Sequence, residues 1–311
     1  YLEKSGNVAE VNFILISMLN HAGINANPVL ISTVKNGIPV FPNLRIFNYV
    51  LAAAQLDGKW VLLDATEKYT SMNILPARVL NWSGRLIRRD GSSEEIQLVP
   101  AAPARELVSM IANIDSQGKI AGKLRIQKTD QLAYEFREAH AGQNKSDYIT
   151  TLENDLGDVK VDTYVCDNCE DVSKPVIETF NFASDNHVEV IGDKMFINPM
   201  LFFTQNRNPF LQENRKLPVY YGYPQQYKYN ITYEIPEGYA VESLPKGLSL
   251  STGENVGQFV FNIAGNGNKI QITINKEINL ALISASFYEN LQAFYKQMIG
   301  KQQDKIVLKK I

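Results

Sequence analysis

The sequence predicts an α+β fold in which one buried helix and an antiparallel sheet are followed by β-sandwich-like domains with a few short helices. Three observations support this prediction. Apolar residues recur at helical spacing from Val8 to Ala22. Three extended segments follow between Pro28 and Asp64. Nearer the C-terminus, apolar or aromatic residues stand at alternate positions, as in strands with one buried face: Tyr227, Tyr229, Ile231, Tyr233, Ile270, Ile272 and Ile274.

The first helix has recognisable ends. Asn7 and Glu10 have the spacing of a capping box, in which the two residues satisfy each other's backbone amides. Gly23 follows the last apolar position and predicts the C-terminal stop. Because Phe13 and Ile16 widen the apolar face, we expect this helix to be mostly buried.

Turn residues separate the strands that follow. The extended segments are 28–33, 47–54 and 59–64, and Asp57-Gly58 between the last two predicts a tight hairpin. A second hairpin is predicted between Arg85 and Leu98, around Asp90-Gly91. These elements form the first predicted domain.

The rest of the chain reads as mostly β. Strands are expected on both sides of the turn at 115–118, followed by short helices at 132–141 and 146–155. A capping-box pattern at Ser286 and Glu289 predicts a last helix that ends at Gly300, and residues 306–308 predict a closing strand. We divide the chain into domains at 1–100, 101–226 and 227–311. A chain of 311 residues is long enough for each to have its own core.

The composition argues against several classes of protein. The chain has 31 basic and 33 acidic residues and a net charge of -2, so it lacks the excess of basic residues that is typical of nucleic-acid-binding proteins. No run approaches the ~18 apolar residues of a membrane-spanning helix. Residues 1–6 lack the charged start and apolar stretch of a signal peptide. No cofactor is expected.

The two cysteines, Cys166 and Cys169, are spaced as Cys-Asp-Asn-Cys. A structural zinc site needs four ligands, and His21, His140 and His187 are far apart in the sequence, so no metal site is expected. The pair is interpreted as a local disulfide or as two unreactive loop thiols. Redox exchange is a further alternative, although the pair precedes a loop instead of opening a helix after a strand.

Three short motifs within the first 66 residues follow one another in a specific order and at specific spacings. Ser5-Gly6-Asn7-Val8 precedes the first helix, Phe47-Asn48-Tyr49-Val50 opens a strand, and Asp64-Ala65-Thr66 follows Trp60 on the next strand. In this order they resemble the cysteine, histidine and aspartate motifs of the transglutaminase-like (papain-related) superfamily. The resemblance implies that Val8, Tyr49 and Asp64 occupy the positions of its catalytic triad.

Two of these three residues differ from the family's triad. Val8 offers no nucleophile, and the phenol of Tyr49 titrates near ~10, too high for a base at neutral pH. Ser5 has no histidine beside it, and His21 is at the far end of the helix, roughly 20 Å away at ~1.5 Å per residue. Cys166 lies in a later domain. We therefore predict no catalytic residues and a degenerate triad, with the alternative that Val8 and Tyr49 are ordinary core residues of an unrelated domain.

The C-terminal part is similar to the last domain of Bacteroidetes envelope proteins of unknown function, on the residues 235–239, 244–246 and 306–310. The resulting hypothesis is a non-catalytic binding or scaffolding module at the cell envelope or in the periplasm, with an unidentified protein, peptide or glycan as its partner. The alternative is a transglutaminase-like cysteine peptidase or amide hydrolase. The resemblance also implies further helices before Tyr1, without which the first helix would expose apolar surface.

Overall fold

The computed structural model describes residues 5–39, 45–140 and 142–311. The predicted helix end at Ala141 and most of the segment 1–6 lie outside these ranges. The described residues contain four α-helices, which are α1 (Val8–His21), α2 (Asp130–His140), α3 (Lys145–Asp155) and α4 (Tyr288–Gln302). The predicted positions of all four helices are thus confirmed, with ends that differ by one or two residues.

The predicted fold class is wrong. Strands make up 41% of the structure and helices 21%, in several sheets, so the chain is mostly β and does not look like an α+β transglutaminase-like fold. The physical reason is pairing between strands distant in the sequence, which builds several sheets and which local patterns do not predict. The first helix also differs from the prediction that it would be mostly buried. Its apolar residues Phe13, Ile14 and Met18 are instead 46%, 40% and 64% exposed, and only Asn12 and Ile16 are buried.

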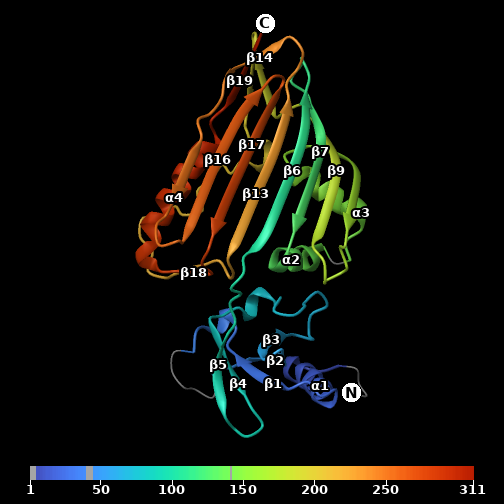
Figure 1. The fold of residues 1–311 in the computed structure, drawn as a ribbon, viewed down its shortest axis with the longest axis vertical. Helices are drawn as coiled ribbons and strands as arrows, with labels where there is room; N and C mark the ends of the chain where they lie inside the picture. The colour runs from blue at the N-terminus through green and yellow to red at the C-terminus, as the bar shows by residue number, and fades with distance from the viewer. Residues whose placement is uncertain (1–4, 40–44, 141) are drawn as a thin grey trace.

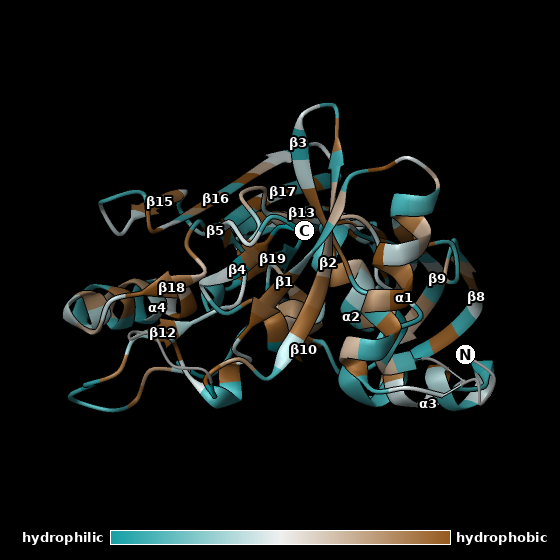
Figure 2. Ribbon diagram, turned by 90° about the horizontal axis from the view of Figure 1, so that it is seen from below, coloured by the Kyte–Doolittle hydropathy of each residue, from teal (hydrophilic) through white to brown (hydrophobic). Residues whose placement is uncertain are grey.

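The N-terminal sheet has five antiparallel strands in the order β3-β2-β1-β4-β5. They are β1 (Ala26–Ile31), β2 (Tyr49–Leu56), β3 (Lys59–Leu63), β4 (Ser83–Ile87) and β5 (Ser93–Gln97). Both predicted hairpins are present, since β2 pairs with β3 across Asp57-Gly58 and β4 with β5 around Asp90-Gly91. Figure 1 shows this sheet and α1 below the much larger C-terminal part. In Figure 2, hydrophobic positions are visible along α1.

An eight-stranded sheet dominates the rest of the chain, in the order β15-β16-β17-β13-β6-β7-β9-β8 (Figure 1). Its strands are β6 (Ala104–Ile114), β7 (Ile120–Lys128), β8 (Lys160–Asp167), β9 (Val176–Ser184), β13 (Gln225–Glu234), β15 (Leu248–Ser251), β16 (Gly257–Asn266) and β17 (Lys269–Ile278). All neighbours are antiparallel except β6 and β13, which pair in parallel over ten residues. The sheet therefore joins strands from both sides of the predicted boundary at 226/227.

Two smaller sheets and α4 complete this part. The four-stranded sheet has the order β10-β11-β19-β14, and β12 pairs with β18. The strands are β10 (Val188–Ile191), β11 (Lys194–Ile197), β12 (Val219–Tyr220), β14 (Tyr239–Ser243), β18 (Leu282–Ile283) and β19 (Ile306–Lys310). One hydrophobic core includes residues of the eight-stranded sheet, the four-stranded sheet and α4, among them Phe180, Phe261, Met195, Leu308 and Leu291. The predicted cap at Ser286 is wrong, because α4 begins after Phe287 without a side-chain cap.

Polar and apolar contacts connect the five-stranded sheet region to the larger part. Tyr220 donates its hydroxyl hydrogen to the carbonyl of Leu80 at 2.6 Å. Tyr223 is buried in the same apolar cluster as Tyr49 and Leu80. Lys68 forms an ion pair with Glu170 at 3.3 Å. Residues near 70 and 80 are thereby held against residues near 170 and 220.

Candidate functional site

The structure brings Tyr49 and Asp64 into direct contact. Tyr49 begins β2, Asp64 follows β3, and the Tyr49 hydroxyl donates to Oδ2 of Asp64 at 2.6 Å. Both residues are buried, with exposed fractions of 7% and 5%. Their meeting follows from the antiparallel pairing of β2 and β3, which places the start of one strand next to the end of the other.

The other carboxylate oxygen of Asp64 also has partners. Asn12 Nδ2 and Thr66 Oγ1 donate to Oδ1 at 3.1 and 2.7 Å, and the Thr66 amide donates to it at 3.0 Å. Asn12 is fully buried on α1 and accepts a hydrogen bond from the amide of Ala65 at 2.9 Å. The carboxylate therefore joins α1 to the ends of two strands in one hydrogen-bonded network.

Arg78 completes this network on the Tyr49 side. Its Nη2 donates to the Tyr49 hydroxyl oxygen at 3.2 Å and forms an ion pair with Glu67. Burial, followed by the hydrogen bond to Asp64, raises the pKa of Tyr49 above its usual value. The phenol thus remains protonated at neutral pH and acts as a hydrogen-bond donor.

Val8 is the third position of the sequence-based triad. It opens α1 and packs against the apolar cluster that contains Tyr49 and Leu62. The start of α1 has the capping box expected from the sequence, because Glu10 N donates to Asn7 Oδ1 at 3.0 Å and Asn7 N to Glu10 Oε2 at 2.7 Å. Ser5 and His21 are exposed at opposite ends of the helix region.

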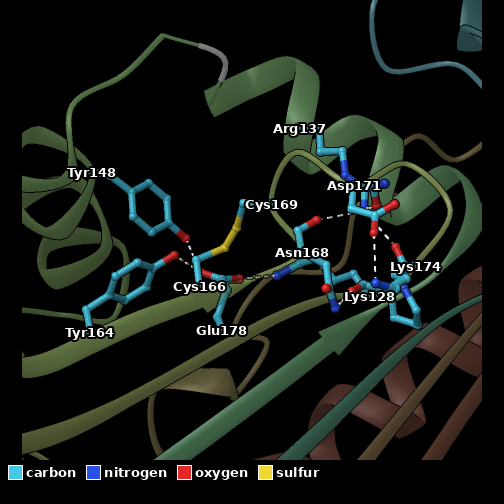
Figure 3. The surroundings of a disulfide bond; sticks show 11 residues. Lys128, Arg137, Tyr148, Tyr164, Cys166, Asn168, Cys169, Asp171, Lys174 and Glu178 are labelled. Atoms are coloured by element: carbon cyan, nitrogen blue, oxygen red, sulfur yellow. Dashed lines mark hydrogen bonds and ion pairs between the residues drawn. A yellow bond between two sulfur atoms is a disulfide. The ribbon is translucent and has the colours of Figure 1, made fainter.

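Cys166 and Cys169 form a disulfide, the first of the interpretations offered by the sequence (Figure 3). The bond closes the short connection between β8 and the loop that precedes β9. Arg137 of α2 is buried against this loop, and its Nη2 donates to the carbonyls of Asn168, Asp171 and Lys174 at 3.1, 2.8 and 2.7 Å. The disulfide and the guanidinium therefore fix the same loop from two sides.

Glu178 of β9 stands opposite Cys166 of β8 in the strand register and is 1% exposed. Its carboxylate accepts hydrogen bonds from the hydroxyls of Tyr148 and Tyr164 and from Lys128 Nζ, the last at 2.7 Å (Figure 3). Burial and the adjacent carboxylate raise the pKa of both tyrosines far above the usual value. A buried carboxyl group loses its contacts with water, and these three donors compensate Glu178 for that loss.

A row of titratable residues crosses the inner face of the large sheet and was missed by the sequence analysis. The registers of β17, β13, β6 and β7 align Lys276, Tyr227, Glu106 and Lys128 side by side. Lys276 Nζ lies 5.5 Å from the ring centre of Tyr227 and 5.1 Å from that of Tyr295. Burial lowers the pKa of Lys276 to about 8, and burial raises the pKa of Glu106. Only pairing across distant strands creates this row, so spacing along the chain could not reveal it.

The described ranges contain no group of three or more His, Cys, Asp or Glu side chains placed to hold a metal ion. Within the same ranges, none of the helices has the length and apolarity required to cross a membrane.

Comparisons with known proteins give a partial match. Residues 193–308 match a family described as a domain of unknown function with a solved structure, DUF3858. No curated protein matches the chain. A crystal structure from Parabacteroides distasonis, described as that of a "putative protease", aligns over 98% of this chain and 44% of its own, with 13% identity and a TM-score of 0.49. This chain therefore spans less than half of that protein's length, and the likeness carries no functional argument.

Proposed function

We propose that the chain is a non-catalytic binding or scaffolding protein, related to the transglutaminase-like superfamily through residues 1–66, in which the triad positions Val8, Tyr49 and Asp64 have become structural. The order of the three motifs supports this relationship. So does the DUF3858 match at 193–308, because that family is often associated with transglutaminase-like proteins.

The observation that carries the proposal is that both oxygens of the Asp64 carboxylate already accept hydrogen bonds within the domain. Tyr49 occupies Oδ2, while Asn12 and Thr66 occupy Oδ1. A carboxylate that orients a catalytic histidine must accept a hydrogen bond from the imidazole. Here that place is taken by a phenol whose pKa is raised, and the nucleophile position is a valine. The geometry favours a stabilising role.

The experiment is an assay of amide hydrolysis and of acyl transfer, using glutamine-containing peptides and casein as substrates. We expect the unmodified protein and Asp64→Asn to give the same background rate. Hydrolysis by the unmodified protein that is lost in Asp64→Asn, with the variant still folded by circular dichroism, would overturn the proposal. The Val8→Cys/Tyr49→His double variant tests separately whether the scaffold can regain activity.

We propose that the protein is periplasmic or associated with the cell envelope. The resemblance of residues 235–239 and 306–310 to envelope proteins suggests this location, and the disulfide supports an oxidising compartment. Alkylation of intact cells followed by mass spectrometry tests whether Cys166 and Cys169 are oxidised in the cell. Full labelling of Cys166 and Cys169 without added reductant would contradict it.

A further inference from the structure

A cavity of about 560 Å³ lies between α2, α3, β8 and the disulfide loop. Its lining comes from separate parts of the chain, with Tyr69 from the N-terminal part, Phe136 and Arg137 from α2, Lys145 and Tyr148 from α3, Tyr164 from β8, and the disulfide loop. This volume is in the range of ligand pockets, which often lie where two parts of a protein meet.

Aromatic rings form one wall. The Tyr148 ring centre is 5.9 Å from that of Phe136, 4.5 Å from His140 and 5.2 Å from Tyr164. The hydroxyls of Tyr148 and Tyr164 are bonded to Glu178, which is outside the lining, so they anchor the rings (Figure 3). With the disulfide beside them, these rings give the cavity a preformed apolar surface.

The loop and the helix ends that border the cavity are fixed as well. Arg137 and the disulfide hold the loop at 168–174, as described above. Asn144 caps α3 by accepting a hydrogen bond from the amide of Asp147 at 2.9 Å. His140 Nδ1 and Gln143 Oε1 are 2.9 Å apart. A ligand would therefore meet walls that need little ordering.

The charges of the lining are unbalanced toward positive. Glu170 is paired with Lys68. Lys145 has no carboxylate partner within the described ranges and lies 5.9 Å from the ring centre of Tyr164. Arg137 is 5% exposed and donates only to carbonyls, and its Nε has no hydrogen-bond partner among the described residues. Because Lys145 and Arg137 have no bonded carboxylate in the described part of the chain, the charge of the lining favours the binding of an anionic ligand.

We propose that this cavity binds a carboxylate attached to an apolar or aromatic body, with Lys145 at the carboxylate and the rings of Phe136, Tyr148 and Tyr164 around the body. This inference rests on the proposed binding role of the chain. A fatty acid and the C-terminal end of a peptide share this chemistry. The buried Arg137 contributes positive potential and holds the loop, and Lys145, being exposed, can reach the ligand directly.

The test uses calorimetric titration with two pairs of probes on the full chain. Dodecanoate is compared with dodecanol, and acetyl-Gly-Phe with a free carboxylate is compared with its amide. For each carboxylate that binds, we expect the neutral analogue to bind with about tenfold lower affinity, because it cannot form the charge-assisted hydrogen bond. Binding of dodecanoate alone, of the peptide acid alone, or of both identifies the source and supports the proposal.

Variants locate the site. Lys145→Gln should weaken binding about tenfold, Lys145→Arg should retain it, and Gln143→Trp should block it by filling the cavity. Lys160→Gln, an exposed lysine of β8 outside the lining, is the matched control and should bind as the parent does. The three positions changed in these four variants are exposed, so folding should survive.

Equal affinity for acid and neutral analogue, no binding of either probe pair, or binding only of neutral oligosaccharides or internal peptides would overturn the proposal. These outcomes are distinct from failure of the proposed function, which is decided by the hydrolysis assay. Absence of probe binding without hydrolysis leaves the non-catalytic role standing. If hydrolysis depends on Asp64 but the carboxylate probes still bind, the non-catalytic role is contradicted and the proposed carboxylate site stands.

Discussion

The hydroxyl of Tyr49 is 2.6 Å from Oδ2 of Asp64, and both side chains are almost completely buried. A charged carboxylate is expensive to bury unless each oxygen is hydrogen-bonded. Tyr49, Thr66 and Asn12 provide these bonds and tie α1 to the sheet. The stability of the N-terminal part should therefore depend on this pair, and that dependence can be measured.

Asp64→Ala should reduce the free energy of unfolding by roughly 3 kcal/mol, because it leaves Tyr49, Thr66 and Asn12 without their acceptor. Tyr49→Phe should cost about 1 kcal/mol. The double variant should cost less than the sum, since the two residues share one hydrogen bond. Urea denaturation provides the values, and Glu95→Ala on the exposed side of β5 is the control. Additive losses would contradict a direct interaction.

Lys276→Met should raise stability at pH 7 by roughly 1–3 kcal/mol, because burial makes the ammonium unfavourable in the folded state. Its folded pKa of about 8 lies below the value of ~10.4 for an unfolded lysine. Between these values the unfolded state binds more protons, so the parent becomes more stable as pH rises. The advantage of the variant should shrink over this window.

Denaturation curves at pH 7, 9 and 10.5 test the Lys276 prediction. Lys269→Met is a suitable control, since Lys269 is an exposed residue at the start of the same strand. A stability difference that does not change with pH would indicate a packing effect instead of a charge effect.

Replacing both Cys166 and Cys169 by serine should destabilise the protein by about 2 kcal/mol, the chain-entropy estimate for a loop this short. Amide exchange should accelerate in the loop at 168–174 but not in β6 or β13. Hydrogen–deuterium exchange with mass spectrometry measures both. Adding reductant to the parent should reproduce the effect, and a reductant-insensitive exchange pattern would show that Arg137 alone holds the loop.

Gly122→Ala should be strongly destabilising, by more than ~2 kcal/mol, because an added Cβ would lie 2.3 Å from the carbonyl oxygen of Ile111 and 2.7 Å from Cα of Ala112. Gly300→Ala is the matched substitution, and we expect it to increase stability. Gly300 is within α4 and its Cβ would meet nothing within 4 Å, so the variant should gain up to about 1 kcal/mol. Thermal unfolding of both variants checks the pair.

Local patterns determined much of the secondary structure. The capping box of Asn7 and Glu10, the Asp57-Gly58 turn and the alternation in β13 and β17 depend on neighbours in the chain, and each appears as predicted. The strand containing Tyr49 and the segment containing Asp64 were also located correctly, because a hairpin brings together residues that are near in sequence.

The arrangement of the sheets and the clusters between distant strands were decided by the tertiary structure alone, because they depend on contacts between residues far apart in the sequence. The parallel pairing of β6 with β13 places these two strands in one sheet, and no local signal distinguishes this arrangement from separate sheets. The charged row at Glu106 and Lys276 arises from that pairing. Strand pairing along the chain gives a mostly β protein in place of the predicted α+β fold. The exposure of Phe13, Ile14 and Met18 also differs from the prediction, since an apolar helix face predicts burial only where another element covers it. The sequence thus determined which residues form helices and strands, and packing between distant segments determined the sheets and the cavity.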